Sequence, residues 1–94
     1  MLVERSEITV REGHEETFCE VLASGVAPLL RAVPGVRMVQ WGRGVEAPGK
    51  FILLVEWDEM ASHTAFTTTP AFDELRKLMF PHSTGGAMEH FDMR

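Results

Sequence analysis

The chain has 94 residues, of which 45% are hydrophobic and 24% are charged, and its formal net charge is −5. This length and composition predict one soluble globular domain spanning residues 1–94. No cluster of Lys and Arg is present, so nucleic acids and anionic membranes are not expected partners, because both bind basic surfaces. The single Cys19 excludes an internal disulfide. The first residues lack the basic and apolar regions of a signal peptide, so we expect a cytoplasmic protein.

The first third of the chain predicts a strand followed by a long helix. Residues 2–10 are expected to form a strand, with Ile8 and Val10 on one face and Glu7 and Thr9 on the other. Residues 14–33 carry apolar side chains at spacings of three and four, which places these side chains on one helix face. Pro28 lies inside this pattern and has no N–H for the carbonyl of Ser24. We therefore expect a kink after Gly25.

The middle of the chain predicts a hairpin. Residues 36–45 form the second expected strand, in which Gly42 and Gly44 indicate a bulge. The turn 47–49 leads into the apolar run 51–55. Because this run does not alternate, it favours a strand that is covered on both faces.

Two helices are expected after the apolar run. Asp58 is a candidate N-cap for a short helix, because its carboxylate can accept a hydrogen bond from the first turn. Thr69 and Pro70 then begin a second helix, since Thr is a good N-cap and Pro needs no donor at the first helical position. The loop 82–86 and the last strand 87–93 complete the chain.

This succession is β-α-β-β-α-β with the second helix split in two, which predicts a ferredoxin-like α+β fold with a four-stranded antiparallel sheet. Helices on one side cover only one face of such a sheet. The strand 51–55 is apolar on both faces, and no further segment is left to cover the second face. We therefore expect a symmetric homodimer with the two sheets face to face, a dimeric α+β barrel.

Several residues of the second half match the pattern of a known family. They are Trp57 with the acidic residue after it, His63, Thr69-Pro70, Phe72, Arg76, Pro81 and His90-Phe91. This pattern resembles the antibiotic biosynthesis monooxygenase family of dimeric α+β barrels, and the resemblance covers nearly the whole chain. It implies a cofactor-independent monooxygenase acting on a small aromatic, phenolic or quinol substrate. The fold also hosts isomerases, cyclases and lyases, and a non-catalytic dimer that binds a small apolar molecule is a further alternative.

The resemblance also implies candidate site residues. His63 and His90 stand where members of the family carry histidine, and either imidazole could take a proton from a phenol or enol. Arg76 would hold the resulting oxyanion. The substrate-binding candidates are Trp57, Phe66, Phe72, Met79, His82 and Met88. The alternative is that these histidines form structural hydrogen bonds and that the aromatic residues only fill the core.

Metal and cofactor motifs are not found. No HxxxH or HxxE spacing places two ligands on one helix face, and no glycine-rich phosphate loop follows a strand. The haem-degrading branch would need a Trp in place of Phe66 and a His in place of Arg76. The chain has no Asn and no Tyr, which excludes the exact site of the aromatic-polyketide oxygenases. We therefore expect neither a metal nor a cofactor.

Overall fold

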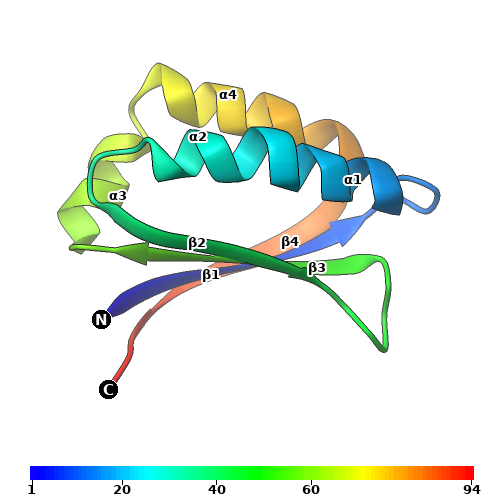
Figure 1. Ribbon diagram of the computed structural model, residues 1–94, viewed down its shortest axis with the longest axis horizontal. Helices are drawn as coiled ribbons and strands as arrows, with labels where there is room; N and C mark the ends of the chain where they lie inside the picture. The colour runs from blue at the N-terminus through cyan, green and yellow to red at the C-terminus, as the bar shows by residue number, and fades with distance from the viewer.

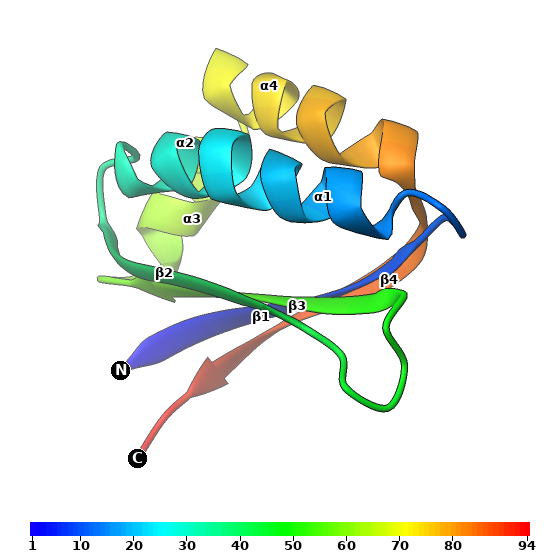
Figure 2. The same cartoon turned by 45° about the vertical axis from the view of Figure 1, so that its right-hand side comes forward.

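Four antiparallel strands form one sheet in the order β2-β3-β1-β4, and the helices lie against one of its faces (Figures 1 and 2). The computed structural model describes residues 1–94. The strands are β1 (Leu2–Val10), β2 (Val36–Arg43), β3 (Lys50–Trp57) and β4 (Ser83–Asp92). The helical segments are α1 (Glu15–Val21), η1 (Leu22–Val26), α2 (Ala27–Arg31), α3 (Met60–Phe66), α4 (Pro70–Met79) and η2 (Phe80–His82). The predicted ferredoxin-like α+β order is confirmed.

The long first helix is irregular at the place that the sequence indicates. Its central segment, η1, is π-helical, and the N–H of Ala27 bonds the carbonyl of Leu22, five residues earlier. This wide turn directly precedes Pro28, so the irregularity takes the form of a π segment rather than a simple kink after Gly25.

The second strand differs from its prediction at both ends. It stops at Arg43 instead of residue 45, and its bulge lies between Val36 and Met38, not at the glycines. Gly42 pairs regularly with Ile52. A Cβ on Gly44 would lie 2.4 Å from the carbonyl oxygen of Ala47, so the turn itself requires glycine there.

The expected Asp58 cap is wrong, because α3 begins at Met60 and its N-cap position falls on Glu59, with no side-chain cap. Helix α4 begins at Pro70 as predicted, but the Thr69 hydroxyl donates backward to the carbonyl of Phe66, at 2.7 Å. Thr67 and Thr68 donate in the same way to the carbonyls of Thr64 and Ala65. The three threonines therefore satisfy the last carbonyls of α3.

The predicted loop 82–86 is wrong as well, because Ser83 already begins β4. Gly86 pairs with Ile8 of β1, and a Cβ there would lie 2.5 Å from the carbonyl oxygen of Glu7. This glycine permits a close approach of two strands, which the sequence alone does not distinguish from a loop.

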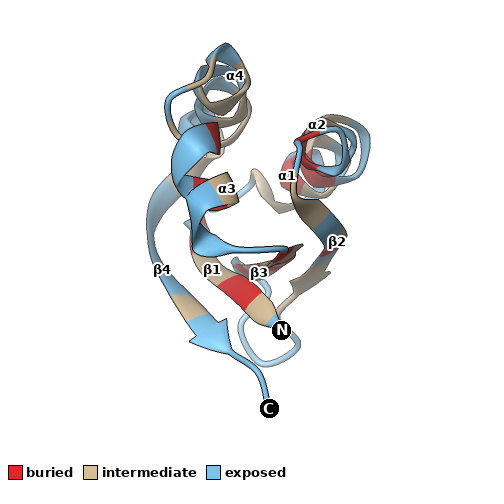
Figure 3. Cartoon of the chain, turned by 90° about the vertical axis from the view of Figure 1, so that its left-hand side faces the viewer, coloured by how far each residue is buried: buried red, intermediate tan, exposed pale blue.

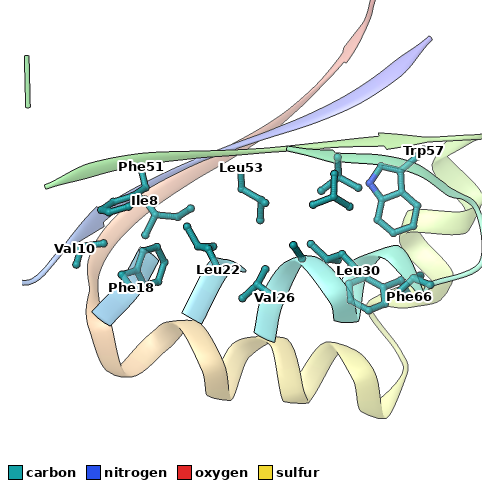
Figure 4. Packing of buried hydrophobic residues seen from close by; sticks show 14 residues of the cluster. Ile8, Val10, Phe18, Leu22, Val26, Leu30, Phe51, Leu53, Trp57 and Phe66 are labelled. Carbon is teal, nitrogen blue, oxygen red and sulfur yellow. The ribbon is translucent and has the colours of Figure 1, made fainter. Parts of the chain in front are cut away.

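The core lies between the sheet and the helices (Figure 4). From β3, Phe51, Leu53, Val55 and Trp57 point into it, and each is at most 3% exposed. Ile52 and Leu54, which alternate with them, are only half-buried in the single chain. We expected both faces of β3 to be covered. In the single chain the helices cover one face, and the other face is open (Figure 3). No helix has the length and apolar character that crossing a membrane requires.

Candidate active site

Three ionisable side chains from three different elements meet between the sheet and α3. Glu4 of β1 lies directly opposite His90 of β4 in the strand pairing, and His63 projects from α3. Oε1 of Glu4 is 3.6 Å from Nε2 of His63 and 3.9 Å from Nε2 of His90. The two imidazole rings meet edge to face, with centroids 4.4 Å apart. We call these residues the Glu4–His63–His90 cluster.

Glu4 is buried and is held by hydrogen bonds. Nε1 of Trp57 donates to its Oε1 at 2.9 Å, and the hydroxyl of Ser6 donates to its Oε2 at 3.3 Å. A buried carboxylate needs such donors to offset the loss of water. Glu4 was not among the residues predicted from the sequence. Its position in the alternation of β1 could have indicated its burial, because Glu4 shares a strand face with the buried Ile8 and Val10.

Burial changes the acidity of one imidazole in the cluster. Burial lowers the pKa of His63 below its ordinary value of 6.5, the Glu4 carboxylate opposes this shift, and His90 adds to it. Nε2 of His90 is buried and forms no hydrogen bond. The separations from Glu4 exceed the usual hydrogen-bond range of about 2.7–3.2 Å, so the three groups surround a point without bonding one another.

A small cavity of about 190 Å³ adjoins the cluster beneath α4. Glu4 and His63 form part of its wall. Among the predicted site residues, those that line it are His63, Phe66, Phe72, Arg76, Met79 and Met88. The cavity is therefore largely apolar, with one polar wall, which suits a small flat molecule carrying a hydroxyl group.

Three predicted site residues do not line this cavity. His90 lies behind His63, in contact with its ring. Trp57 is 1% exposed and belongs to the core, where it contacts His63 and holds Glu4. His82 lies near α1, with its Nδ1 3.1 Å from Nδ1 of His14. A bulky buried indole therefore supports the cluster from within the core instead of forming a substrate wall.

Arg76 lies at the rim of the cavity and is exposed. Its guanidinium carbon is 5.7 Å from the ring centroid of Phe72 and 5.1 Å from that of Phe80. It forms no ion pair with Asp73 or Glu56, the two partners that the sequence offers. The aromatic rings thus hold the cation at the rim and leave its N–H groups free for a ligand oxygen.

A larger apolar hollow of about 460 Å³ lies between α2 and α3, with Leu29, Pro34 and Ala65 among its walls. No ionisable side chain lines it. Acid–base or metal chemistry needs such groups. We therefore assign the candidate site to the cavity beside the Glu4–His63–His90 cluster.

Comparison with known proteins places this chain in a family. Residues 1–78 match the model of the family described as antibiotic biosynthesis monooxygenase. A crystal structure from Bordetella bronchiseptica, of a protein named provisionally as an antibiotic biosynthesis monooxygenase, has 27% identity and a TM-score of 0.91, covering 99% of this chain and 96% of that one. No curated protein matches the chain.

More distant structures share the fold. A protein from Nitrosomonas europaea with the same provisional name has 16% identity and a TM-score of 0.81, with 99% of this chain and 98% of that chain covered. A protein from Pseudomonas aeruginosa has 19% identity and a TM-score of 0.81, with 99% and 93% covered. At these identities the likeness concerns the fold alone.

Proposed function

Because the chain belongs to the antibiotic biosynthesis monooxygenase family, we propose that it is a monooxygenase acting on a small aromatic, phenolic or quinol substrate. The observation that carries this proposal is that the polar cluster forms one wall of the apolar cavity. His63 and Glu4 belong both to the polar cluster and to the apolar cavity. A substrate in the cavity would therefore present its hydroxyl group to the cluster.

The cavity suits one small ring system. Its volume of about 190 Å³ lies below the roughly 300–1,000 Å³ of pockets that hold drug-sized ligands. Phe66 and Phe72 meet edge to face at 5.5 Å and offer aromatic surface to a flat ligand. Met79 and Met88 complete the apolar wall with adaptable side chains.

The chemistry follows from the polar wall. Loss of the hydroxyl or enol proton to the cluster leaves an electron-rich anion, and Arg76 at the rim would hold the anionic oxygen. The anion then reduces O₂. One oxygen atom enters the product, the other leaves as water, and the substrate supplies all four electrons, as in the oxidation of an anthrone to an anthraquinone. This balance needs no flavin or haem.

Oxygen uptake with a panel of hydroquinones and anthrones tests the proposal. We expect uptake by the wild-type protein and incorporation of one atom from ¹⁸O₂ into the product. The double variant His63→Ala/His90→Ala should lose at least about 100-fold in rate, within the range that removal of acid–base groups costs. The matched control is His14→Ala, which removes an imidazole outside the cavity and should retain the rate.

Three other outcomes would contradict it. Undiminished uptake in the double variant would remove the cluster from the mechanism. Turnover without O₂ would favour an isomerase, cyclase or lyase on the same scaffold. Ligand binding without any turnover would leave a non-catalytic binding protein.

The open face of the sheet supports a homodimer as the working form. Ile52 and Leu54 are half-buried there, and Phe91 on the same face is 41% exposed. Packing this face against a second copy would remove apolar surface from water at about 25 cal/mol per Å². Sedimentation over a dilution series should show a dimer, and Leu54→Glu should shift it toward monomer. Monomer at every concentration of the wild type would reject the dimer.

A further inference from the structure

We propose that Glu4, His63 and His90 form a binding site for one divalent transition-metal ion. The inference shares its site with the proposed function but does not depend on it, because metal binding is measured without substrate. Three features of the site support an ion: the three donors converge, one nitrogen has no partner, and hydrogen bonds hold the carboxylate.

The three donor atoms enclose a space of ionic size. They lie within 4.8 Å of one another, and Oε1 of Glu4 is 3.6 Å and 3.9 Å from the two imidazole nitrogens. A point equidistant from all three lies no more than about 2.4 Å from each, close to the 2.0–2.2 Å of zinc bonds to His and Glu. A small inward movement of the side chains would complete the coordination distances.

The nitrogen of His90 supplies an independent observation. Its Nε2 atom is buried, faces the carboxylate of Glu4 and has no hydrogen-bond partner. Buried polar atoms in folded proteins nearly always have a partner, so an orphaned one requires an explanation. An ion between the three donors would satisfy this nitrogen and Nε2 of His63 at the same time.

The surroundings of Glu4 match those of a metal ligand. Hydrogen bonds from Trp57 and Ser6 fix the carboxylate, and each of its oxygens keeps a lone pair. Such outer hydrogen bonds orient ligands in metal sites. Side-chain exposure of 11–17% across the three residues leaves the site shielded from bulk water.

The donor set selects the class of ion. Two imidazoles and one carboxylate suit Zn²⁺, Fe²⁺, Co²⁺ or Ni²⁺, whereas Mg²⁺ and Ca²⁺ prefer oxygen ligands. Three protein ligands leave coordination positions open. Because Glu4 and His63 also line the cavity, an open position would face a bound molecule. There the ion would hold the substrate's hydroxyl oxygen and favour its anion, the task assigned above to the cluster.

Spacing along the chain gives no hint of this site. The expectation of no metal rested on the lack of an HxxxH or HxxE spacing on one helix. Here β1, α3 and β4 contribute one ligand each. The set exists only because strand pairing places Glu4 opposite His90 and α3 covers both.

Titration of the tag-free, chelator-treated protein with Co²⁺ tests the proposal, because Co²⁺ absorption bands report coordination by nitrogen and oxygen. We expect one ion per chain, and competition by Zn²⁺. Glu4→Gln, which keeps the size of the side chain, and His90→Ala should each weaken binding by at least about 100-fold. The control His14→Ala should bind as the wild type does, and circular dichroism should show that all variants are folded.

Binding that survives Glu4→Gln and His90→Ala, or that is lost in His14→Ala, would overturn the proposal, as would a dissociation constant above about 1 mM. Failure of this inference and failure of the proposed function are distinguishable. Oxygen uptake by the metal-free protein with no Co²⁺ binding supports the function and rejects the ion. Stoichiometric Co²⁺ binding without any oxygen uptake does the reverse.

Discussion

Two pairs of histidines lie at opposite ends of the helix–sheet interface, and they differ in what surrounds them. The rings of His63 and His90 have centroids 4.4 Å apart, and those of His14 and His82 have centroids 5.4 Å apart. In the first pair both Nε2 atoms face the buried Glu4 without hydrogen-bonding it. In the second pair the two Nδ1 atoms are 3.1 Å apart, so one ring donates directly to the other.

The difference separates a structural pair from a candidate site. His14 precedes α1 and His82 ends η2, so their hydrogen bond joins two segments that are distant in the chain. The N–H of Arg11 adds a second link, at 2.8 Å, to the carbonyl of His82. The His63–His90 pair instead has one buried nitrogen without a partner, a neighbouring carboxylate and an adjoining cavity. Both pairs bring two imidazoles together. Only the surroundings of the His63–His90 pair indicate chemistry.

Replacement of Trp57, which contacts His63 and donates to Glu4, should have the largest effect. Trp57→Ala removes a fully buried indole and should lower the free energy of unfolding by about 3–5 kcal/mol. Trp57→Phe keeps most of the volume and loses only the donor to Glu4, so it should cost about 1–3 kcal/mol. Urea denaturation measures both values. Equal losses of unfolding free energy in the two variants would show that packing of the indole is not its main contribution.

A methyl group on β4 should disturb the His63–His90 pair through the strand register. Gly86→Ala places a Cβ 2.5 Å from the carbonyl oxygen of Glu7, so β1 and β4 must separate, at a cost of roughly 1–3 kcal/mol. Gly85→Ala meets nothing within 4 Å and should change stability by less than about 0.5 kcal/mol.

Imidazole proton resonances show which histidine pair responds to this change. In Gly86→Ala we expect the His90 signal to shift, because this residue depends on the β1–β4 register. Signals of the Gly85→Ala control should coincide with those of the wild type. Unchanged His90 signals in a destabilised Gly86→Ala protein would show that the register survives.

Removal of the second pair should have a smaller effect and leave chemistry intact. His14→Ala deletes one partly buried hydrogen bond, which is worth about 0.5–1.5 kcal/mol. Oxygen uptake should remain that of the wild type, because His14 lies outside the cavity. Thermal unfolding and uptake are measured on the same preparation. A loss of uptake without a loss of stability would make the second pair functional.

The smallest effect concerns Glu7, the other glutamate that shares β1 with Glu4. A hydrogen bond and the charge of Lys50 lower the pKa of Glu7 below 4.5. Its carboxylate therefore stabilises the folded state above the unfolded pKa, and this contribution is lost as the pH falls through the folded pKa. Lys50→Met should raise the pKa of Glu7 and flatten this acid dependence. Carbon-13 titration of the carboxyl group measures it, and an unchanged pKa would reject the pairing.

The order and type of the elements could be predicted from local pattern. The alternation along residues 7–10 lies within the observed β1, and the Thr69-Pro70 pair lies at the start of α4. Local pattern failed where tertiary contacts decide. Gly86 looks like a loop residue, although its missing side chain serves the approach of β1. Asp58 looks like a cap, although its N–H bonds the carbonyl of Gly35 and α3 begins only at Met60.

Part of the candidate site was predictable from local pattern as well. Phe66, Phe72 and Met79 line the cavity because their spacing on α3 and α4 already places them on the inner helix faces. Glu4 was missed because a single charged residue in a strand is usually solvated. Trp57 was expected at the substrate, whereas it lies in the core behind His63.

The type and order of the helices and strands follow from local sequence, because hydrophobic periodicity and turn residues act over a few neighbouring positions. The sequence also supplied the resemblance to the family whose model residues 1–78 match. Only the tertiary structure decided which charged groups meet. Glu4, His63 and His90 come together through the β1–β4 register and the placement of α3 over it, and these depend on contacts between residues far apart in the chain.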